Sequence, residues 1–379
     1  MRYNEAMLKS LSASFQYANG SFEEKIMKKL NKGSCSTIRF GQKCAITLFV
    51  LSAICLYAAE PGFSAGVPTQ ISCIKTKAFR AYLAAKIPGM KVSSSGGIGR
   101  NVNTFSDAAG QRSALLLILF GVSNNDTFAI DNGVKALIMP FSYQNDDGTF
   151  KCPAAGSKKV EPRDIYGEAM FIGAVGEAAL VLKDSPYADT YLPKLLVCKA
   201  RVKRWFAHII TIKDAVLEID RNFCNRLAFD ALAFESFGVL FNDRELIAIG
   251  ETFIRETMRM QSEQGYYPDN KGPDTSYNAV TAWKMQVCSL YAGEKLKPLM
   301  VNSIARAMAW EIERIDLQTG AVSVDENVRT GKGQEKFLGH VKDVNFQEVA
   351  YSLFYWETIG GNAAAGELGG KVIAYALKK

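Results

Sequence analysis

The chain has 379 residues, of which 48% are hydrophobic and 22% charged; this balance is typical of a globular protein and excludes an intrinsically disordered one. The formal net charge is +7, but without residues 1–65 the chain has 37 basic and 34 acidic residues, a balance of about +3. No basic run is interleaved with aromatic residues, so nucleic acid is not an expected partner, whereas an anionic glycan would not be repelled.

The N-terminal segment has the pattern of a secretory signal. Residues 44–59 form an uncharged apolar run of 16 residues, shorter than the roughly 20 that a membrane span needs. Small residues follow, and Phe63-Ser64-Ala65 fits a cleavage site. We therefore expect residues 1–65 to be an N-terminal extension and signal peptide of an exported protein, periplasmic or extracellular, with no stable membrane insertion after signal removal. A retained anchor helix is the alternative, and a start at Met27 instead of Met1 stays open. The basic flank before the apolar run consists of Lys28, Lys29, Lys32, Arg39 and Lys43.

The cysteines outside this leader are five in number and show no C-x-x-C spacing, so a zinc site is not expected. An exported protein can form disulfides, and Cys73 with Cys152 is the pair we consider. Buried free thiols are the expectation for Cys198, Cys224 and Cys288, which lie in apolar runs. Because the only two histidines, His208 and His340, are far apart in the sequence, we expect no metal site, and no cofactor is expected either.

Apolar residues recur every three or four positions from Ser113 onward, which predicts a helical protein. Before that point residues 66–112 are mixed, and the glycine-rich stretch 93–99 lacks the spacing of a phosphate-binding loop. Strand-like runs are few. The predicted helices cover about 113–121, 131–142, 163–183, 187–209, 222–241, 243–263, 276–292, 296–315 and 344–358.

A weak repeat marks the ends of the predicted helical hairpins. At Gly148, Gly265 and Gly320 a helix end is followed by a glycine and a short extended piece, and the glycines are 117 and 55 residues apart. A recurring helix pair must bury its apolar face on its neighbours, as in a solenoid or a closed ring of hairpins. We therefore expect residues 66–379 to form a single all-α domain, an (α/α) toroid with short strands at the hairpin turns. An irregular helical bundle is the alternative.

Polar and aromatic residues collect at helix ends between residues 222 and 278. Asn222–Arg226 opens one predicted helix, Gly265–Tyr267 follows the next, and Asp274–Tyr277 opens a third. This layout suits a long polar ligand such as a polysaccharide. Together with the Asn-Val-Arg-Thr-Gly-Lys sequence at 327–332, these segments resemble the toroid polysaccharide lyases of the alginate- and glucuronan-lyase type, over roughly residues 160–360.

The resemblance implies an exported lyase that cleaves a uronic-acid polysaccharide, of the alginate or glucuronan class, by β-elimination. That reaction removes the proton on C5 beside the uronate carboxylate, so Asn, Arg or His donors must neutralise the carboxylate. A Tyr or His takes the proton, and a Tyr can donate one to the leaving oxygen. At the matching positions the catalytic candidates are Tyr277, His340, Asn225 and Arg329. The expected substrate contacts are Asn222, Arg226, Tyr266, Tyr267, Asn278, Lys332, Lys342 and His208.

Structural roles compete with these catalytic ones. Asn222 is suited to a helix N-cap, Tyr277 to half-buried packing, and Arg226 to an ion pair with Asp230 one helical turn away. The 327–340 stretch can equally be a solvated surface loop.

Two other functions stay open for the same fold. A glycoside hydrolase needs two carboxylates that flank one bond, and no spacing in the sequence pairs the available candidates. A glycan-binding protein of the cell envelope would keep the aromatic residues and the charged loop without needing Tyr277. The hydrolase candidates are Asp269, Asp274, Asp325 and Glu326.

We predict that the exported protein has lost residues up to about Ala65, because the apolar run is flanked as in a cleaved signal. Mass spectrometry of the natively expressed protein is expected to show a start between residues 60 and 66. A full-length chain retained in the cytoplasm would contradict export.

Overall fold

Helices make up most of the described chain, which in the computed structural model covers residues 67–152, 165–270, 272–331, 335–337 and 339–379. The expected signal peptide and Lys332 lie outside these residues. Within them the only strands are the two-residue β1 (Lys336–Phe337) and β2 (His340–Val341), which pair antiparallel. The expectation of an all-α protein is therefore confirmed. The helices are α3 (Gln70–Ile74), α4 (Lys77–Lys86), α5 (Leu115–Asn124), α6 (Thr127–Ile138), α7 (Ile165–Lys183), α8 (Ala188–Leu195), α9 (Lys199–Asp220), α10 (Cys224–Phe241), α11 (Arg244–Met260), α12 (Thr275–Tyr291), α13 (Lys297–Ile312), α14 (Phe346–Ile359) and α15 (Ala363–Lys378).

In each of two helical hairpins, the two helices are joined by a two-residue connection with the sequence Asn-Asp. Asn125 ends α5 and Asn242 ends α10, both in the left-handed conformation that asparagine tolerates. The following residues, Asp126 and Asp243, accept hydrogen bonds from backbone N–H groups in the first turns of α6 and α11. The two connections are 117 residues apart, which is also the spacing of Gly148 and Gly265.

The glycines of the predicted repeat are held in matching environments. Gly148, Gly265 and Gly320 all have positive φ, at 94°, 103° and 78°. A Cβ at each would come within 3 Å of backbone atoms of a helix later in the chain. These atoms belong to Arg204 of α9, Arg306 of α13 and Lys371 of α15 respectively. Each hairpin turn thus lies directly on a later helix. It needs glycine because of the positive φ and because a side chain would collide with that helix.

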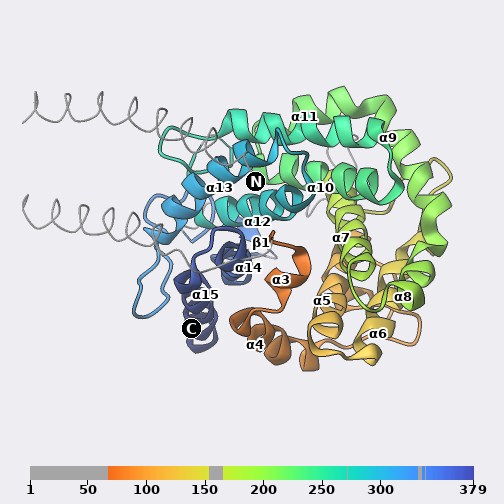
Figure 1. The fold of residues 1–379 in the computed structure, drawn as a ribbon, viewed down its shortest axis with the longest axis horizontal. Helices are drawn as coiled ribbons and strands as arrows, with labels where there is room; N and C mark the ends of the chain where they lie inside the picture. Colours follow the sequence, from red (N-terminus) through yellow and green to blue (C-terminus); the bar gives the residue numbers. More distant parts are fainter. Residues whose placement is uncertain (1–66, 153–164, 271, 332–334, 338) are drawn as a thin grey trace, which may run out of the picture. The chain divides into compact units, whose positions relative to one another are not determined.

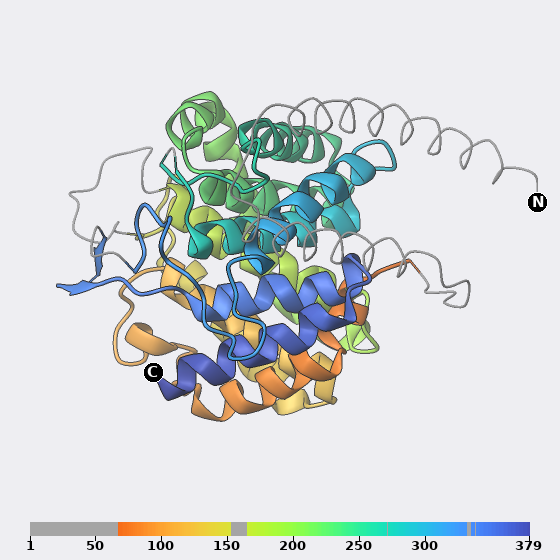
Figure 2. The same cartoon turned by 90° about the vertical axis from the view of Figure 1, so that its left-hand side faces the viewer.

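One set of helices forms an unbroken series of neighbours. Helix α5 contacts α7, α7 contacts α10, α10 contacts α12, and α12 contacts α14, while α3 contacts both α14 and α5. Helices α5, α10, α12 and α14 each also pack against the helix that follows in sequence. Figure 1 shows the first described helices, α3 and α4, beside the last two, α14 and α15, and the turned view in Figure 2 agrees.

The helices of this series, called the inner helices below, are largely buried. Helix α7 is long and apolar enough to cross a membrane by length and composition, but 89% of the relevant window is buried inside the fold, as in the core helix of a globular protein. Its Gly176 allows close packing on α10, because a Cβ there would lie 2.0 Å from the Ser236 hydroxyl.

Some boundaries differ from the sequence expectation. The helix expected at 187–209 is two helices, α8 and α9, separated by a 3₁₀ turn at Leu196–Cys198; Pro193 removes one backbone hydrogen bond from the short α8. Helices α3, α4 and α15 were not predicted. Helix α15 contains Gly366, Gly369 and Gly370, which lower helix propensity, and Gly369 instead allows contact with Phe354 of α14.

The considered Cys73–Cys152 disulfide is not formed. All five cysteines of the described part are free and buried. Burial raises the pKa of Cys73 to about 12, which keeps the thiol protonated and unreactive. Cys152 lies beside Ala108, Ala109 and Glu168, whereas Cys73 lies near Thr358 of α14, so the two thiols have separate surroundings.

A buried ion pair ties α7 to α12. The Nζ atom of Lys284 lies 3.2 Å from Oε2 of Glu177, and both side chains are at least 96% buried. Gln70 donates to Oε1 of Glu177 at 2.9 Å, and the Tyr355 hydroxyl donates to the same oxygen at 3.2 Å. Glu177 therefore joins four helices, α3, α7, α12 and α14.

We predict that Glu177→Ala destabilises the protein by about 3–5 kcal/mol, because it leaves a buried ammonium without its partner. Urea unfolding is expected to show a lower midpoint. The control is Asp214→Ala, which removes the exposed partner of Lys213 and is expected to leave the midpoint unchanged. A midpoint for Glu177→Ala equal to that of the wild type would show that Lys284 is relieved in another way.

Candidate functional site

Asp274 fixes the start of α12 and holds the 327–330 segment against it. Its Oδ1 accepts from the backbone N–H of Ser276 at 3.1 Å and of Tyr277 at 3.4 Å, as an N-cap does. Its Oδ2 accepts from the backbone N–H of Arg329 at 3.1 Å and of Thr330 at 2.8 Å. The fully buried carboxylate thereby brings Arg329 next to Tyr277.

Asn327 makes a second bridge between the same two segments. Its Oδ1 accepts from the Thr275 backbone N–H at 3.0 Å, and its Nδ2 donates to the Thr275 hydroxyl at 2.9 Å. The Ser276 hydroxyl accepts from the Asn345 backbone N–H at 2.9 Å, which adds the start of α14. The starts of α12 and α14 and the 327–330 segment are therefore one hydrogen-bonded unit.

Tyr277, Glu335 and Lys342 form a compact polar cluster. The Tyr277 hydroxyl donates to Oε2 of Glu335 at 2.9 Å and accepts from Nζ of Lys342 at 2.5 Å. The Lys342 ammonium also lies 3.3 Å from Oε1 of Glu335. The guanidinium of Arg329 lies 4.4 Å from the centre of the Tyr277 ring, and the Lys342 ammonium lies 4.6 Å from it. Two cations thus flank one phenol.

Arg329 joins this cluster to the loop before α12. Its NH1 lies 2.6 Å from Oδ2 of Asp269, and its NH2 lies 3.0 Å from Oε1 of Glu335. Burial raises the pKa of Asp269 to about 6, although Arg329 opposes this shift. The other oxygen of Asp269, Oδ1, is buried without a hydrogen-bond partner.

The surroundings shift the pKa values of Tyr277 and Glu335 in opposite directions. Burial raises the pKa of the Tyr277 hydroxyl well above its ordinary value, so the phenol keeps its proton. Burial alone would raise the pKa of Glu335, but Lys342 and Arg329 hold it below its ordinary value. The cluster is therefore a protonated hydroxyl that donates to a carboxylate and is itself hydrogen-bonded by an ammonium.

The segment that opens α10 lies beside Asp269. Phe223 pairs with Asp269 as an isolated bridge, and the Asn222 carbonyl accepts from the Asn270 N–H at 3.0 Å. The Asn222 side chain is exposed and makes no cap, since the N-cap residue of α10 is Phe223. Asn225 is buried, and its Oδ1 has no hydrogen-bond partner.

Arg226 compensates two buried carboxylates. Its NH1 lies 3.1 Å from Oδ1 of Asp220, instead of the ion pair with Asp230 that the spacing suggested. Burial raises the pKa of Asp220 to about 6, against the pull of Arg226, and burial together with Asp220 raises the pKa of Asp230. The guanidinium also lies over the rings of Tyr166 and Phe223. Arg226 is thus engaged in packing and charge balance.

Tyr267 and Asn278 do not offer their side chains to a ligand, which corrects the expected substrate contacts. Both are fully buried. The Tyr267 hydroxyl lies 2.7 Å from that of Ser303, and Asn278 accepts from the Tyr267 N–H and donates to Oε2 of Glu311 at 2.8 Å. Both residues adjoin a more exposed neighbour, Tyr266 or Tyr277, and the change of direction from one residue to the next turns them inward.

Three other expected residues make no polar contact with the cluster among the described residues. Tyr266 is half-buried against Trp310, with ring centres 5.1 Å apart. His208 lies on α9, and His340 is exposed in β2. In the described part of the chain neither histidine makes a hydrogen bond or ion pair with Tyr277, Arg329 or Lys342. Conversely, the sequence expectation missed Glu335, an acid within a basic glycine-rich loop.

Two of the hydrolase candidates, Asp274 and Glu326, are engaged in other contacts. Both oxygens of Asp274 accept hydrogen bonds from backbone N–H groups, and Glu326 is paired with Arg314 at the surface. Within the described residues, no group of three or more His, Cys, Asp or Glu side chains is placed to hold a metal ion.

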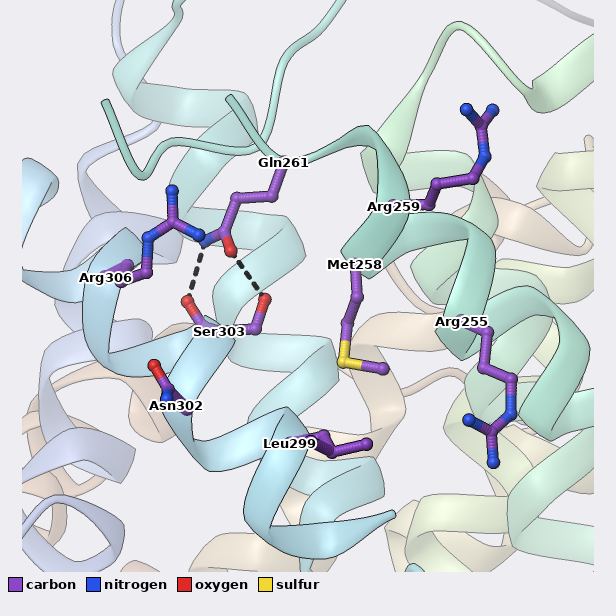
Figure 3. Close-up of a pocket in the computed structure, with 8 residues that line it drawn as sticks. All are labelled: Arg255, Met258, Arg259, Gln261, Leu299, Asn302, Ser303 and Arg306. Carbon is purple, nitrogen blue, oxygen red and sulfur yellow. Dashed lines mark hydrogen bonds between the residues drawn. The ribbon is translucent and has the colours of Figure 1, made fainter. Parts of the chain in front are cut away.

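An arginine-rich groove of about 490 Å³ lies between α11 and α13 (Figure 3). Arg255 pairs with Glu251 and Arg259 with Glu256, while Arg306 donates to the Ser262 carbonyl. The groove has no Tyr, His, Lys, Asp or Glu in its lining, so it has no group suited to proton transfer. The Tyr277 cluster is the better candidate for chemistry.

Comparison of the chain with protein-family models, with curated proteins and with solved structures finds no match. The candidate site is therefore assigned from its own geometry and chemistry.

We predict that Glu311→Gln flattens the pH dependence of stability. Burial raises the pKa of Glu311 from 4.5 to about 8, although the Asn278 hydrogen bond opposes it. Between these pH values the native state holds a proton that the unfolded chain has released, so wild-type stability falls as the pH rises through this window. Gln resembles the protonated acid and keeps the acceptor for Asn278. Thermal melts from pH 5 to pH 8 are expected to show a smaller fall for the variant.

The control is Glu313→Gln, an exposed neighbour on the same chain segment, which is expected to retain the wild-type profile. Parallel profiles for Glu311→Gln and the wild type would mean that Glu311 is ionised in the fold.

Proposed function

We propose that the chain is an exported (α/α) toroid that cleaves a uronic-acid polysaccharide of the alginate or glucuronan class by β-elimination. The observation that carries the proposal is the Tyr277 hydroxyl, hydrogen-bonded to both Glu335 and Lys342 and flanked by Arg329. The proposed localisation, periplasmic or extracellular, rests on the sequence pattern of residues 1–65 alone.

The order of helix contacts supports the toroid. The series α5, α7, α10, α12 and α14 returns through α3 to α5, and most of its members pair with a following outer helix. Identical Asn-Asp connections, 117 residues apart, fit a ring built from repeated hairpins. An irregular bundle would not require either regularity.

The charges of the cluster suit an elimination reaction. The C5 proton of a uronate becomes acidic enough to remove only when its carboxylate is neutralised, and Arg329 and Lys342 are the cations nearest the phenol. Both are partly exposed, which leaves their outer sides open to a substrate. Since neither cation is isolated, their ion pairs also hold them in place before substrate binds.

The proton path follows the hydrogen bond from Tyr277 to Glu335. Tyr277 takes the C5 proton as it passes its own proton to Glu335, so that a phenolate, which its raised pKa disfavours, is not formed. The C5–H electrons form the C4–C5 double bond, and the bond from C4 to the leaving oxygen breaks. The same hydroxyl gives a proton to that oxygen and recovers one from Glu335, so the enzyme ends unchanged.

We predict that Tyr277→Phe lowers the cleavage rate by about 10²–10⁴ while the melting temperature changes little, because phenylalanine keeps the ring but cannot transfer a proton. The assay follows the ultraviolet absorbance of the unsaturated product with alginate, glucuronan and pectate as substrates. The matched control is Tyr143→Phe, an exposed tyrosine stacked on Phe105, which is expected to keep wild-type activity. Wild-type cleavage by Tyr277→Phe would reduce Tyr277 to a packing residue and remove the main chemical support for a lyase.

A hydrolase on the same fold is the second candidate, because Asp269, with its pKa raised to about 6 and one unpartnered oxygen, has the properties of a general acid. It would release sugar without the ultraviolet band of the unsaturated product. Binding without cleavage would instead favour a glycan-binding envelope protein.

A further inference from the structure

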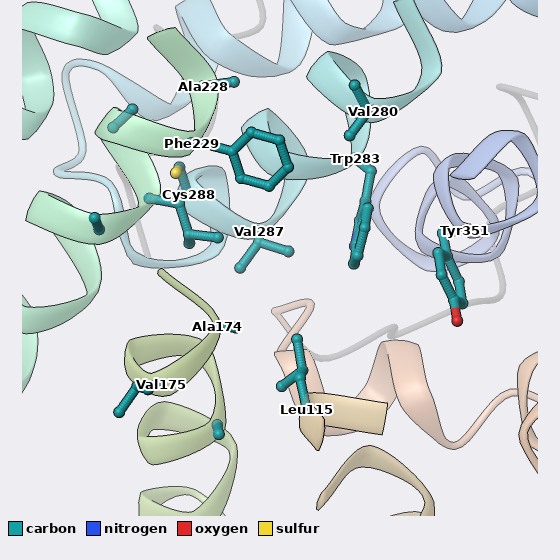
Figure 4. Packing of buried hydrophobic residues seen from close by; sticks show 14 of the residues in the cluster. Leu115, Ala174, Val175, Ala228, Phe229, Val280, Trp283, Val287, Cys288 and Tyr351 are labelled. Atoms are coloured by element: carbon teal, nitrogen blue, oxygen red, sulfur yellow. The ribbon is translucent and has the colours of Figure 1, made fainter. Parts of the chain in front are cut away.

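A second cavity, distinct from the Tyr277 cluster, lies among the inner helices. Its volume is about 140 Å³, and α5, α7, α10, α12 and α14 all contribute to its lining. Figure 4 shows Trp283 of α12 and Leu115 of α5 reaching toward the same interior space, with Tyr351 of α14 beside it. The side chains that carry the argument are Arg112, Trp283, Lys284, Asn345, Glu348 and Tyr351.

The cavity has an open end and a closed end. Arg112, Asn345 and Glu348 are partly exposed, whereas Trp283 and Lys284 are buried. Behind Lys284 lies its ion pair with Glu177, which also binds Gln70 and Tyr355. A chain cannot pass through this hydrogen-bonded floor, so the cavity accepts only the end of a polymer or a small molecule.

The lining combines the small exposed part of an aromatic ring with polar groups at the open end. Trp283 is 7% exposed; Nζ of Lys284 lies 3.3 Å from the centre of its ring, the Tyr351 ring centre lies 4.8 Å away, and its Nε1 is buried without a hydrogen-bond partner. Arg112 donates to the Ala109 carbonyl at 2.9 Å, and neither Arg112 nor Glu348 makes an ion pair within 4 Å with a described residue, although their opposite charges lie close enough to interact. Hydroxyl groups both donate and accept, so a polyhydroxylated ring with one carboxylate would satisfy these groups together.

The cavity and the Tyr277 cluster share the same helices. Tyr277 and Lys284 are seven residues apart on α12, which places them on one face of the helix about 10.5 Å apart along its axis. Asn345, which lines the cavity, donates its backbone N–H to Ser276, the neighbour of Tyr277. One polysaccharide can therefore reach both places.

Resting on the lyase function proposed above, we propose that this cavity binds the terminal uronic-acid residue of the polysaccharide, with the carboxylate on Arg112 and the sugar ring against the exposed edge of Trp283. The closed floor then makes cleavage exolytic, because Tyr277 acts at a fixed distance from the chain end.

Calorimetric titration of the mature protein with free D-glucuronate, D-galacturonate, D-mannuronate and neutral D-glucose tests the binding step. At least one uronate is expected to bind more tightly than glucose. Arg112→Gln is expected to weaken uronate binding by on the order of 10-fold and to leave glucose binding unchanged. Trp283→Phe is expected to weaken binding of both sugar types. The matched control is Arg80→Gln, which lies on α4 and contacts Asn124 outside the cavity.

Absence of uronate binding, or an unchanged uronate preference in Arg112→Gln, would overturn the proposal. If Arg112→Gln does not fold, Arg112→Lys, which keeps the charge, and Trp283→Phe, which keeps an aromatic ring, replace it. A folded Trp283→Phe variant with wild-type affinity would also overturn the proposal. Uronate binding without polymer cleavage would support this site and contradict the lyase. Polymer cleavage without uronate binding would contradict this site and support the lyase.

The size distribution of the products tests the mode of cleavage. Exolytic action is expected to release short unsaturated products while the remaining polymer shortens slowly in size-exclusion chromatography. A rapid early fall in mean polymer length would show internal cleavage and overturn the closed-end assignment.

Discussion

The Asp274 carboxylate is the interaction on which the candidate site depends. It caps α12, and it also binds two backbone N–H groups of a segment more than 50 residues later in the chain. A buried carboxylate without such donors would be strongly unfavourable, so the 327–330 segment and the helix start stabilise each other. Tyr277 and Arg329 are neighbours because this one side chain accepts from both of their backbones.

Other buried carboxylates in the fold are also paired with a neighbouring group. Glu177, Asp269 and Asp220 are buried, and each lies beside a single cation, Lys284, Arg329 or Arg226. Buried pairs of this kind give little net stability but are costly to break, so they favour one arrangement of helices over others. The candidate site is accordingly preorganised: its cations are oriented by fixed acids before any ligand arrives.

The sequence predicted the bounds of α10 and α11 closely, whereas α6 begins at Thr127 and not at the expected residue 131. Asn-Asp at the ends of α5 and α10 gives both a left-handed C-terminal residue and an N-cap, and the positive-φ glycines mark the turns. Helix α15 escaped detection because its glycines serve contact with α14 and not intrinsic helix propensity. Tyr277, Arg329 and Lys342 were each named from the sequence as candidates, and the structure brings them together. Tyr267 and Asn278 were misjudged because adjacent residues point in different directions. Glu335 was missed because its hydrogen bond to Tyr277 spans 58 residues, which no local pattern indicates.

The contact between the first and last described helices affects how the chain reaches its native state. Gln70 and Tyr355 are 285 residues apart, yet both bind Glu177 in the interior. Contacts between such distant residues carry a large loop-closure entropy and form late. During synthesis α3 and α4 therefore have no partner in α14 and α15 until almost the whole chain has been made. Until then the ribosome-bound chain lacks its final closing contacts, so apolar surfaces of α3 and α4 stay uncovered for most of synthesis.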